Sequence, residues 1–139
     1  MKFKGGCHCG NLSLEFDTGL EPKALTLRAC QCTFCRAHGA LSVSDPKGKV
    51  IIAARDATAV ERYRFGLGVT DFLICRRCGV YILAMMELDG ARYAVVNANA
   101  LERRAEIPGP PQPMDYEGED ARLARRKTRW TPVAALNGF

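Results

Sequence analysis

The 139-residue sequence has no long apolar run. A helix that crosses a bilayer needs roughly 20 consecutive apolar residues, so we do not expect the chain to span a membrane. The first residues, Met1-Lys2-Phe3-Lys4-Gly5-Gly6, also lack the apolar stretch of a secretory signal peptide. These absences lead us to expect a cytoplasmic protein.

Charge of one sign is in only slight excess. The chain has 20 Lys and Arg against 15 Asp and Glu, a net charge of +5, which suits an anionic small molecule as well as it suits nucleic acid. Basic residues gather between Arg122 and Arg129, but no aromatic side chains interleave with them. We therefore expect no nucleic-acid partner and interpret this run as the solvated face of a helix.

Alternation of apolar and polar residues, the period of a half-buried strand, dominates the first hundred residues. It predicts strands at residues 11–16, 24–29, 40–44, 50–52, 61–65, 70–74, 81–87 and 91–96. The last two flank Asp89-Gly90, a dipeptide that supplies the positive φ angles of a tight hairpin turn. The pattern predicts a mainly β fold with little helix.

Beyond Leu101 the strand signal fades, and Pro108, Pro110, Pro111 and Pro113 indicate a surface loop. A short basic helix is predicted at 119–130. We found no internal repeat, and we expect one zinc-binding domain over residues 1–139, with residues 105–139 forming a Pro-rich, basic tail packed on it.

All seven cysteines fall in three groups: Cys7-x-Cys9, Cys30-x-Cys32-x-x-Cys35 and Cys75-x-x-Cys78. An odd number would strand one thiol in a disulfide framework, and a reducing cytoplasm disfavours disulfides. A two-residue spacing allows one turn to direct two sulfurs at an ion about 2.3 Å away, the zinc–thiolate distance. Neighbouring glycines allow the backbone to bend closely around a metal. The cysteines are therefore predicted to bind two zinc ions per chain.

The division of the ligands is an inference from their number. The two outer pairs sum to four sulfurs, the closed tetrahedral set of a structural zinc site: Cys7, Cys9, Cys75 and Cys78. Cys30, Cys32 and Cys35 then remain as three ligands of a second, catalytic-type zinc with one open position. Three alternatives stay open at this stage: the triplet joined by one outer cysteine, an iron–sulfur cluster, and a second zinc site closed by His38 or His8.

The cysteine motifs resemble a known family. They read Gly6-Cys7-His8-Cys9-Gly10, then Cys30-Gln31-Cys32-Thr33-Phe34-Cys35-Arg36-Ala37-His38-Gly39-Ala40, then Cys75-Arg76-Arg77-Cys78-Gly79. Together with Val95-Val96-Asn97, Leu101 and the ending Arg129-Trp130-Thr131-Pro132, they look like the glutathione-dependent formaldehyde-activating enzymes and the centromere protein V-like proteins.

This resemblance implies the Mss4-like fold, a tent of coiled antiparallel sheets stabilised by zinc. It implies the same division of the cysteines, with a structural zinc on the outer pairs and a catalytic zinc on the triplet. It also implies a zinc-dependent carbon–sulfur lyase activity that makes or breaks S-hydroxymethylglutathione or a related thiol–aldehyde adduct.

The residues are compatible with that chemistry. Zinc with three thiolates has a net charge of −1, and such a centre favours a fourth thiol over a water that must ionise to hydroxide. His38 is a candidate to move the proton, unless it simply faces solvent. Arg36, Arg76 and Arg77 are candidates to bind the carboxylates of glutathione, or they only offset the thiolate charge. The alternative function is a non-catalytic, zinc-stabilised binding module with both zincs structural.

Overall fold

The computed structural model describes residues 1–114 and 119–139, and they fold as a mainly β structure with two α-helices. Residues 115–118 of the predicted tail lie outside the described part. Four short 3₁₀ turns lie between the described strands, at Pro22–Ala24, Ala57–Ala59, Ala98–Ala100 and Arg104–Glu106. The strands are β1 (Lys2–Gly6), β2 (Leu12–Asp17), β3 (Arg28–Cys30), β4 (Ser42–Val43), β5 (Lys49–Ala54), β6 (Val60–Tyr63), β7 (Thr70–Cys75), β8 (Tyr81–Leu88), β9 (Ala91–Asn97), β10 (Gln112–Met114) and β11 (Thr131–Asn137), and the helices are α1 (Thr33–His38) and α2 (Glu119–Arg129).

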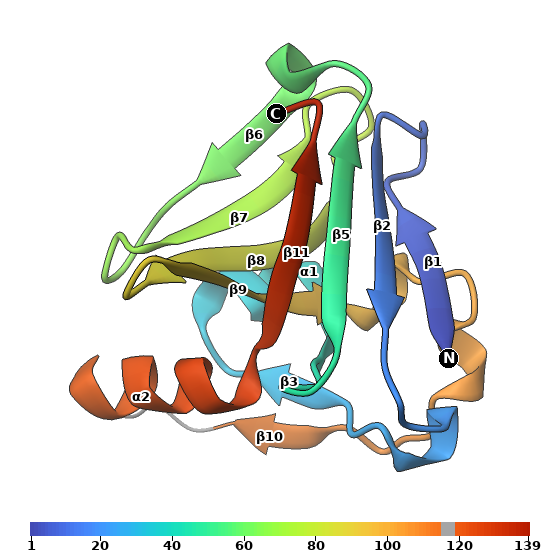
Figure 1. The fold of residues 1–139 in the computed structure, drawn as a ribbon, viewed down its shortest axis with the longest axis vertical. Helices are drawn as coiled ribbons and strands as arrows, with labels where there is room; N and C mark the ends of the chain where they lie inside the picture. Colours follow the sequence, from blue (N-terminus) through green and yellow to red (C-terminus); the bar gives the residue numbers. More distant parts are fainter. Residues whose placement is uncertain (115–118) are drawn as a thin grey trace.

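The strands form two walls that meet at β11 (Figure 1). One wall has the order β1-β2-β5-β11, and the other contains β9 with β8, β7 and β6 on one side and β4, β3 and β10 on the other. The first residues of β11 pair with β9, and the later ones pair with β5. All pairings are antiparallel except β11 with β5 and β10 with β3. The predicted fold of coiled antiparallel sheets is confirmed.

The burial patterns explain where the strands lie. Residues of β2 alternate between buried and accessible positions, as expected for a strand with one face on the core. β8 is buried at six consecutive positions because its side chains pack into two apolar clusters: Ile82, Leu83 and Met85 into one, and Tyr81, Ala84 and Met86 into the other. Asp89 and Gly90 both have positive φ angles, 54° and 79°, and they form the tight turn predicted between β8 and β9.

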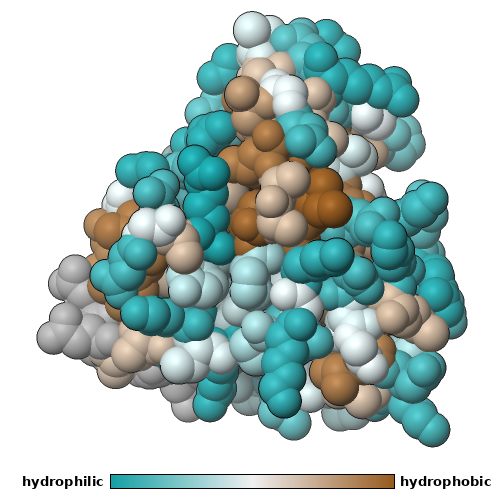
Figure 2. Space-filling view, viewed as in Figure 1, coloured by the Kyte–Doolittle hydropathy of each residue, from teal (hydrophilic) through white to brown (hydrophobic). Residues whose placement is uncertain are grey.

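The core fills the space between the two walls. Its largest fully buried side chains include Phe3, Phe16, Ile52, Leu73 and Leu83, which come from both walls. The face seen in Figure 2 is mostly hydrophilic, with an apolar patch in the region of β11, a strand whose Val133 and Leu136 are only partly buried.

The strands β1, β10 and β11 and the helix α1 were not predicted. β1 has a single large apolar side chain, Phe3, and residues 112–114 and 131–137 were assigned to the tail. Of the strand predicted at 24–29, only the last two residues belong to β3; Pro22–Ala24 form a 3₁₀ turn. The helix predicted at 119–130 is α2, which ends one residue earlier. Instead of lying over the surface, residues 131–137 join the two walls.

Candidate metal centres

The first group of sulfurs belongs to Cys7, Cys9, Cys75 and Cys78, the four-cysteine group. It joins the loop between β1 and β2 to the turn between β7 and β8. All four sulfurs lie within 4.8 Å of one another; Cys9 is 3.7 Å from Cys7 and 3.5 Å from Cys75. A tetrahedral ion with bonds of about 2.3 Å would hold sulfurs about 3.8 Å apart. The four-cysteine group therefore has the geometry of a tetrahedral metal site.

Backbone geometry sets the directions of these sulfurs. The N–H of Leu12 donates to the sulfur of Cys7 over 3.2 Å, a contact that favours the thiolate. In the second turn, Gly79 N–H donates to the carbonyl of Cys75 over 2.8 Å, with Gly79 at φ +79°. Gly6 allows β1 to approach β2, because a Cβ there would lie 2.2 Å from the Leu12 carbonyl oxygen. The predicted use of glycines beside the ligands is thus confirmed at Gly6 and Gly79.

Two members of the four-cysteine group belong to the core, while Cys78 is half-buried against it and Cys9 is exposed. Cys75 is completely buried, and Cys7 and Cys75 pack in the same apolar cluster as the large side chains of both walls. An ion here would link the β1–β2 end of one wall to the β7–β8 turn of the other. Its position is suited to stabilising the fold.

The second group consists of Cys30, Cys32 and Cys35, the cysteine triplet. Cys30 ends β3, Cys32 is the N-cap of α1, and Cys35 lies in the helix. The Cys32 sulfur accepts the Cys35 backbone N–H over 3.3 Å, as an N-cap side chain does. The three sulfurs lie within 4.8 Å of one another. The fold therefore brings together the sulfurs of both predicted sets, the four-cysteine group and the cysteine triplet.

The triplet's thiols titrate together. Hydrogen bonds from Cys32 and Cys35 lower the pKa of Cys30 to about 2, whereas the hydrogen bond to Cys30 raises the pKa of Cys35. The Cys30 thiolate is thus stabilised by hydrogen bonds from the protonated thiols of Cys32 and Cys35. A divalent cation would take the place of these protons and allow all three sulfurs to ionise.

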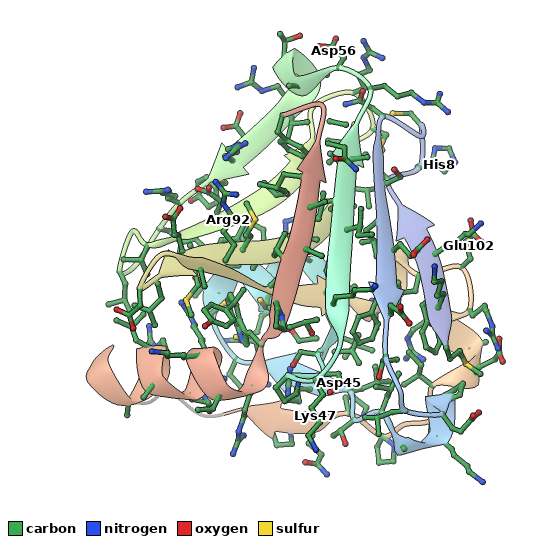
Figure 3. The ribbon with its side chains drawn as sticks, in the orientation of Figure 1. His8, Asp45, Lys47, Asp56, Arg92 and Glu102 are labelled. Carbon is green, nitrogen blue, oxygen red and sulfur yellow. The ribbon has the colours of Figure 1, made fainter. Side chains whose placement is uncertain are left out.

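No histidine nitrogen joins either group among residues 1–114 and 119–139. His8 lies exposed on the loop between β1 and β2 (Figure 3). His38 is the exposed last residue of α1, where its ring is 4.4 Å from that of Phe34 and 5.7 Å from that of Tyr81, between centroids. In this structure, neither closes the triplet as a fourth ligand.

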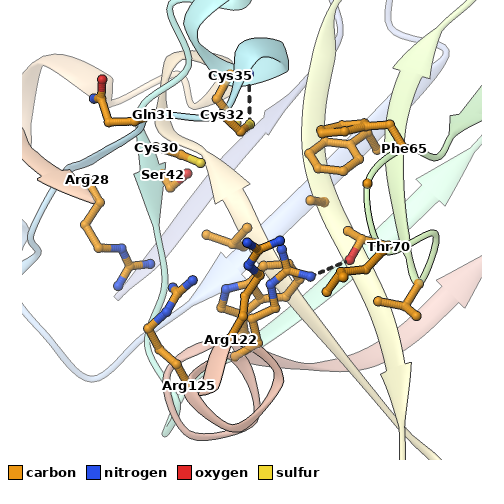
Figure 4. Close-up of a pocket in the computed structure, with 18 of the residues that line it drawn as sticks. Arg28, Cys30, Gln31, Cys32, Cys35, Ser42, Phe65, Thr70, Arg122 and Arg125 are labelled. Atoms are coloured by element: carbon orange, nitrogen blue, oxygen red, sulfur yellow. Dashed lines mark hydrogen bonds between the residues drawn. The ribbon is translucent and has the colours of Figure 1, made fainter. Parts of the chain in front are cut away.

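A cavity of about 220 Å³ opens beside the triplet, and all three of its cysteines line the wall (Figure 4). Apolar residues, among them Phe72, Val95 and Trp130, form much of the remaining lining, and residues 65–70 form one rim. No member of the four-cysteine group lines this cavity. The two candidate metal centres therefore differ: one lies at the edge of the core with Cys9 exposed, and the other faces a cavity that admits a ligand.

Four arginines line the same cavity: Arg28 from β3, and Arg122, Arg125 and Arg126 from α2. Figure 4 shows Arg122 and Arg125 across the space from the cysteines, and Arg28 on the same side as Cys30, with which it shares β3. Burial, and then the charge of neighbouring arginines, lowers the pKa of Arg28 and Arg126 to about 10, which leaves both charged at neutral pH. The wall opposite the triplet is cationic.

The arginines named from the sequence as candidate carboxylate ligands lie away from the cavity. Arg76 pairs with Glu61 and Arg77 with Asp56, both at 3.0 Å, and neither they nor Arg36 lines the cavity. The interpretation of the 122–129 run as a merely solvated helix face is also wrong, because three of its arginines line the cavity. The missed signal is the spacing of 122, 125 and 126, which places them on one side of a helix.

Tyr81 also lines the cavity, and the sequence analysis did not single it out. It is 3% exposed, and burial, followed by the charge of the three cysteines of the triplet, raises its pKa well above the ordinary value. Its hydroxyl therefore stays protonated beside the sulfurs and is available as a hydrogen-bond donor.

The fold and the two sets of sulfurs define a cysteine-rich β protein with two candidate metal centres, one of them beside a ligand cavity. The chain belongs to the family of glutathione-dependent formaldehyde-activating enzymes, whose family model matches residues 2–112. A comparison with curated proteins gave no match. Among solved structures, a crystal structure of a Rhodobacter sphaeroides protein is similar, with 28% identity and a TM-score of 0.57, and the match covers 80% of this chain and 99% of that one. No described helix of this chain is long and apolar enough to cross a membrane.

Proposed function

We propose that residues 1–139 form one zinc-binding domain that makes or breaks S-hydroxymethylglutathione or a related thiol–aldehyde adduct, as a carbon–sulfur lyase. The observation that carries this proposal is the cysteine triplet in the wall of a cavity, with no fourth ligand among the described residues. Membership of the glutathione-dependent formaldehyde-activating family supports it.

Both groups of sulfurs suit zinc, which binds thiolates in tetrahedral sites. The four-cysteine group would hold a structural ion, and the triplet would hold the second. Bound there, zinc would accept the sulfur of a thiol substrate and favour its ionised form. We retain a cytoplasmic location in the proposal, because thiolate sites need a reducing compartment.

The chain's own residues orient the reaction. In the forward direction the substrate sulfur attacks the aldehyde carbon, a carbon–sulfur bond forms, and the carbonyl oxygen becomes negative before it takes a proton from water. The Tyr81 hydroxyl, protonated in the cavity wall, would donate a hydrogen bond to that oxygen. In reverse, the hydroxyl proton of the adduct leaves and the carbon–sulfur bond breaks. Phe72 and Val95 give the cavity an apolar wall beside the triplet.

The proton-moving role predicted for His38 stays a prediction. His38 does not line the cavity but contacts the Tyr81 ring, so it would act between Tyr81 and solvent and not on the substrate itself.

The test is the rate of exchange between free thiol plus formaldehyde and the adduct, measured by exchange NMR with the zinc-loaded protein. We expect acceleration by wild type and none by Cys35→Ser, a variant that keeps the four-cysteine group. A wild-type protein with two zincs that accelerates neither direction for any thiol tested would refute the lyase proposal and point to the non-catalytic binding module.

A further inference from the structure

Arg28 and Arg126 are positioned in the cavity wall by neutral groups. Arg28 donates to the Ser44 hydroxyl over 2.6 Å, and Ser44 in turn donates to the Arg129 carbonyl over 2.8 Å. Arg126 donates to the Thr70 hydroxyl over 2.8 Å and lies over the Trp130 ring at 4.8 Å. These contacts hold the two guanidinium groups in place without neutralising them.

Hydrogen-bonding capacity is left over. The Nε atoms of Arg28 and Arg126 are buried and have no hydrogen-bond partner among the described residues. Among the described residues, no Asp or Glu forms an ion pair with Arg28 or Arg126. A buried donor without an acceptor is unfavourable, and a charged one more so. A carboxylate bound against the accessible side of each guanidinium would offset its charge.

Arg28 and Arg126 bring two positive charges to a cavity that no described Asp or Glu lines. Three thiolates around a divalent ion supply a net charge of only −1. A ligand that offers one carboxylate to each of these two guanidinium groups is favoured, and an ammonium group placed beside them would be repelled.

The cavity is also small. At about 220 Å³ it lies below the range of roughly 300–1,000 Å³ that is typical of sites for drug-sized ligands. Glutathione is a tripeptide with an ammonium group beside one of its two carboxylates. A shorter thiol acid fits the space and the charge better.

Arg28 lies inside the family match, but the arginines that α2 contributes to the cationic wall lie outside it. The match ends at residue 112, whereas α2, which supplies Arg126, begins at residue 119. The family's name therefore does not fix what binds against this helix.

We propose that the thiol partner of this site is a compact acid with two carboxylates and no ammonium group, held with one carboxylate on Arg28 and the other on Arg126. This inference rests on the proposed function, because it assumes that the substrate sulfur reaches the cysteine triplet.

The chain's single tryptophan provides the assay, because Trp130 is 5% exposed and lines the cavity. Tryptophan fluorescence of the zinc-loaded protein is titrated with mercaptosuccinate (two carboxylates), 3-mercaptopropionate (one), 2-mercaptoethanol (none) and glutathione. We expect mercaptosuccinate to bind at least about tenfold more tightly than 3-mercaptopropionate and glutathione, and 2-mercaptoethanol to bind most weakly.

Variants then assign the carboxylate contacts. Arg126→Gln and Arg28→Gln should each weaken mercaptosuccinate at least about tenfold and leave 2-mercaptoethanol unchanged. Arg129→Gln is the matched control: Arg129 is exposed on the same helix and does not line the cavity, so both ligands should bind it as they bind wild type. A variant that fails to fold would bind every ligand more weakly, so comparing mercaptosuccinate with 2-mercaptoethanol distinguishes loss of folding from loss of a carboxylate contact.

The outcomes distinguish the two proposals. Glutathione binding as tightly as mercaptosuccinate, or an Arg126→Gln effect that is the same for charged and neutral thiols, overturns the dicarboxylate inference and leaves the lyase proposal standing. If no thiol binds, while succinate binds and Arg126→Gln weakens it, the lyase proposal fails and the assignment of the carboxylates is supported. If neither thiols nor succinate bind, both fail.

Discussion

Replacing Cys75 by serine tests whether the four-cysteine group carries a structural ion. Cys75 is completely buried and belongs to both the sulfur set and the core. A structural zinc contributes about 10–16 kcal/mol of apparent binding energy, so one of four ligands accounts for about 3–4 kcal/mol. A buried serine hydroxyl without a partner costs about 1–3 kcal/mol more. The sum, about 4–7 kcal/mol, is comparable with the whole stability of a domain, about 5–15 kcal/mol.

We therefore expect Cys75→Ser to be largely unfolded or insoluble. The measurements are zinc per chain by inductively coupled plasma mass spectrometry and thermal unfolding by circular dichroism. The matched control is Cys35→Ser, which is also buried but belongs to the triplet. It should stay folded and lose one of two zincs.

Two results would refute this reasoning. The first is a Cys75→Ser protein that retains two zincs and unfolds within a few degrees of wild type, which would mean that the sulfurs of the four-cysteine group do not hold an ion that stabilises the core. The second is a Cys35→Ser protein that collapses as completely as Cys75→Ser, which would make both centres structural.

Three further predictions follow from the site and the backbone. A chelator added to the zinc-loaded protein should remove the triplet's ion first with the far-ultraviolet spectrum unchanged, and the second ion only together with unfolding; simultaneous loss would contradict the difference between the two centres. Tyr81→Phe should slow adduct exchange by about 10²-fold without changing zinc content, and His38→Gln should slow it less; equal rates for Tyr81→Phe and wild type would remove Tyr81 from the mechanism. Gly79→Ala should lower the free energy of unfolding by only about 1–2 kcal/mol, because the φ angle of Gly79 is strained for alanine but its surroundings are open. Gly6→Ala should prevent folding, because the added Cβ would overlap the Leu12 carbonyl. Similar denaturation midpoints for the two variants would show that the β1–β2 contact adapts.

The parts of the fold that could be predicted are those where local pattern and tertiary environment agree. The β8–β9 hairpin combines apolar strands with a turn dipeptide that takes positive φ angles, so its sequence specifies both strands and their connection. The cysteine sets were predictable for a similar reason: short spacings force neighbouring sulfurs toward one ion, and the number in each set fixes the rest.

The missed strands depend on partners distant in the sequence. β1 buries only Phe3, and its strand conformation comes from five residues paired with β2. β11 contains Pro132, which suggests a loop, but the strand changes partner from β9 to β5 just after this residue. Its first residue, Thr131, is completely buried and accepts the backbone N–H of Asp45 over 2.8 Å. Such long-range pairings leave no periodic signal in the segment itself.

The helix α2 shows why the cationic wall escaped the sequence analysis. A surface helix ordinarily turns its apolar stripe toward the protein and its charges toward water, so a helix rich in arginine suggests a solvated face. Here the inward side carries Arg122, Arg125 and Arg126, and these arginines face a cavity instead of a packed core. Leu123 and Trp130 supply the apolar contacts that attach the helix. The same arginine pattern is unfavourable over an apolar core and favourable over a cavity that takes an anion. The inward position of Arg126, which pairs with no described acidic side chain, is what the proposed anionic ligand beside the cysteine triplet would explain.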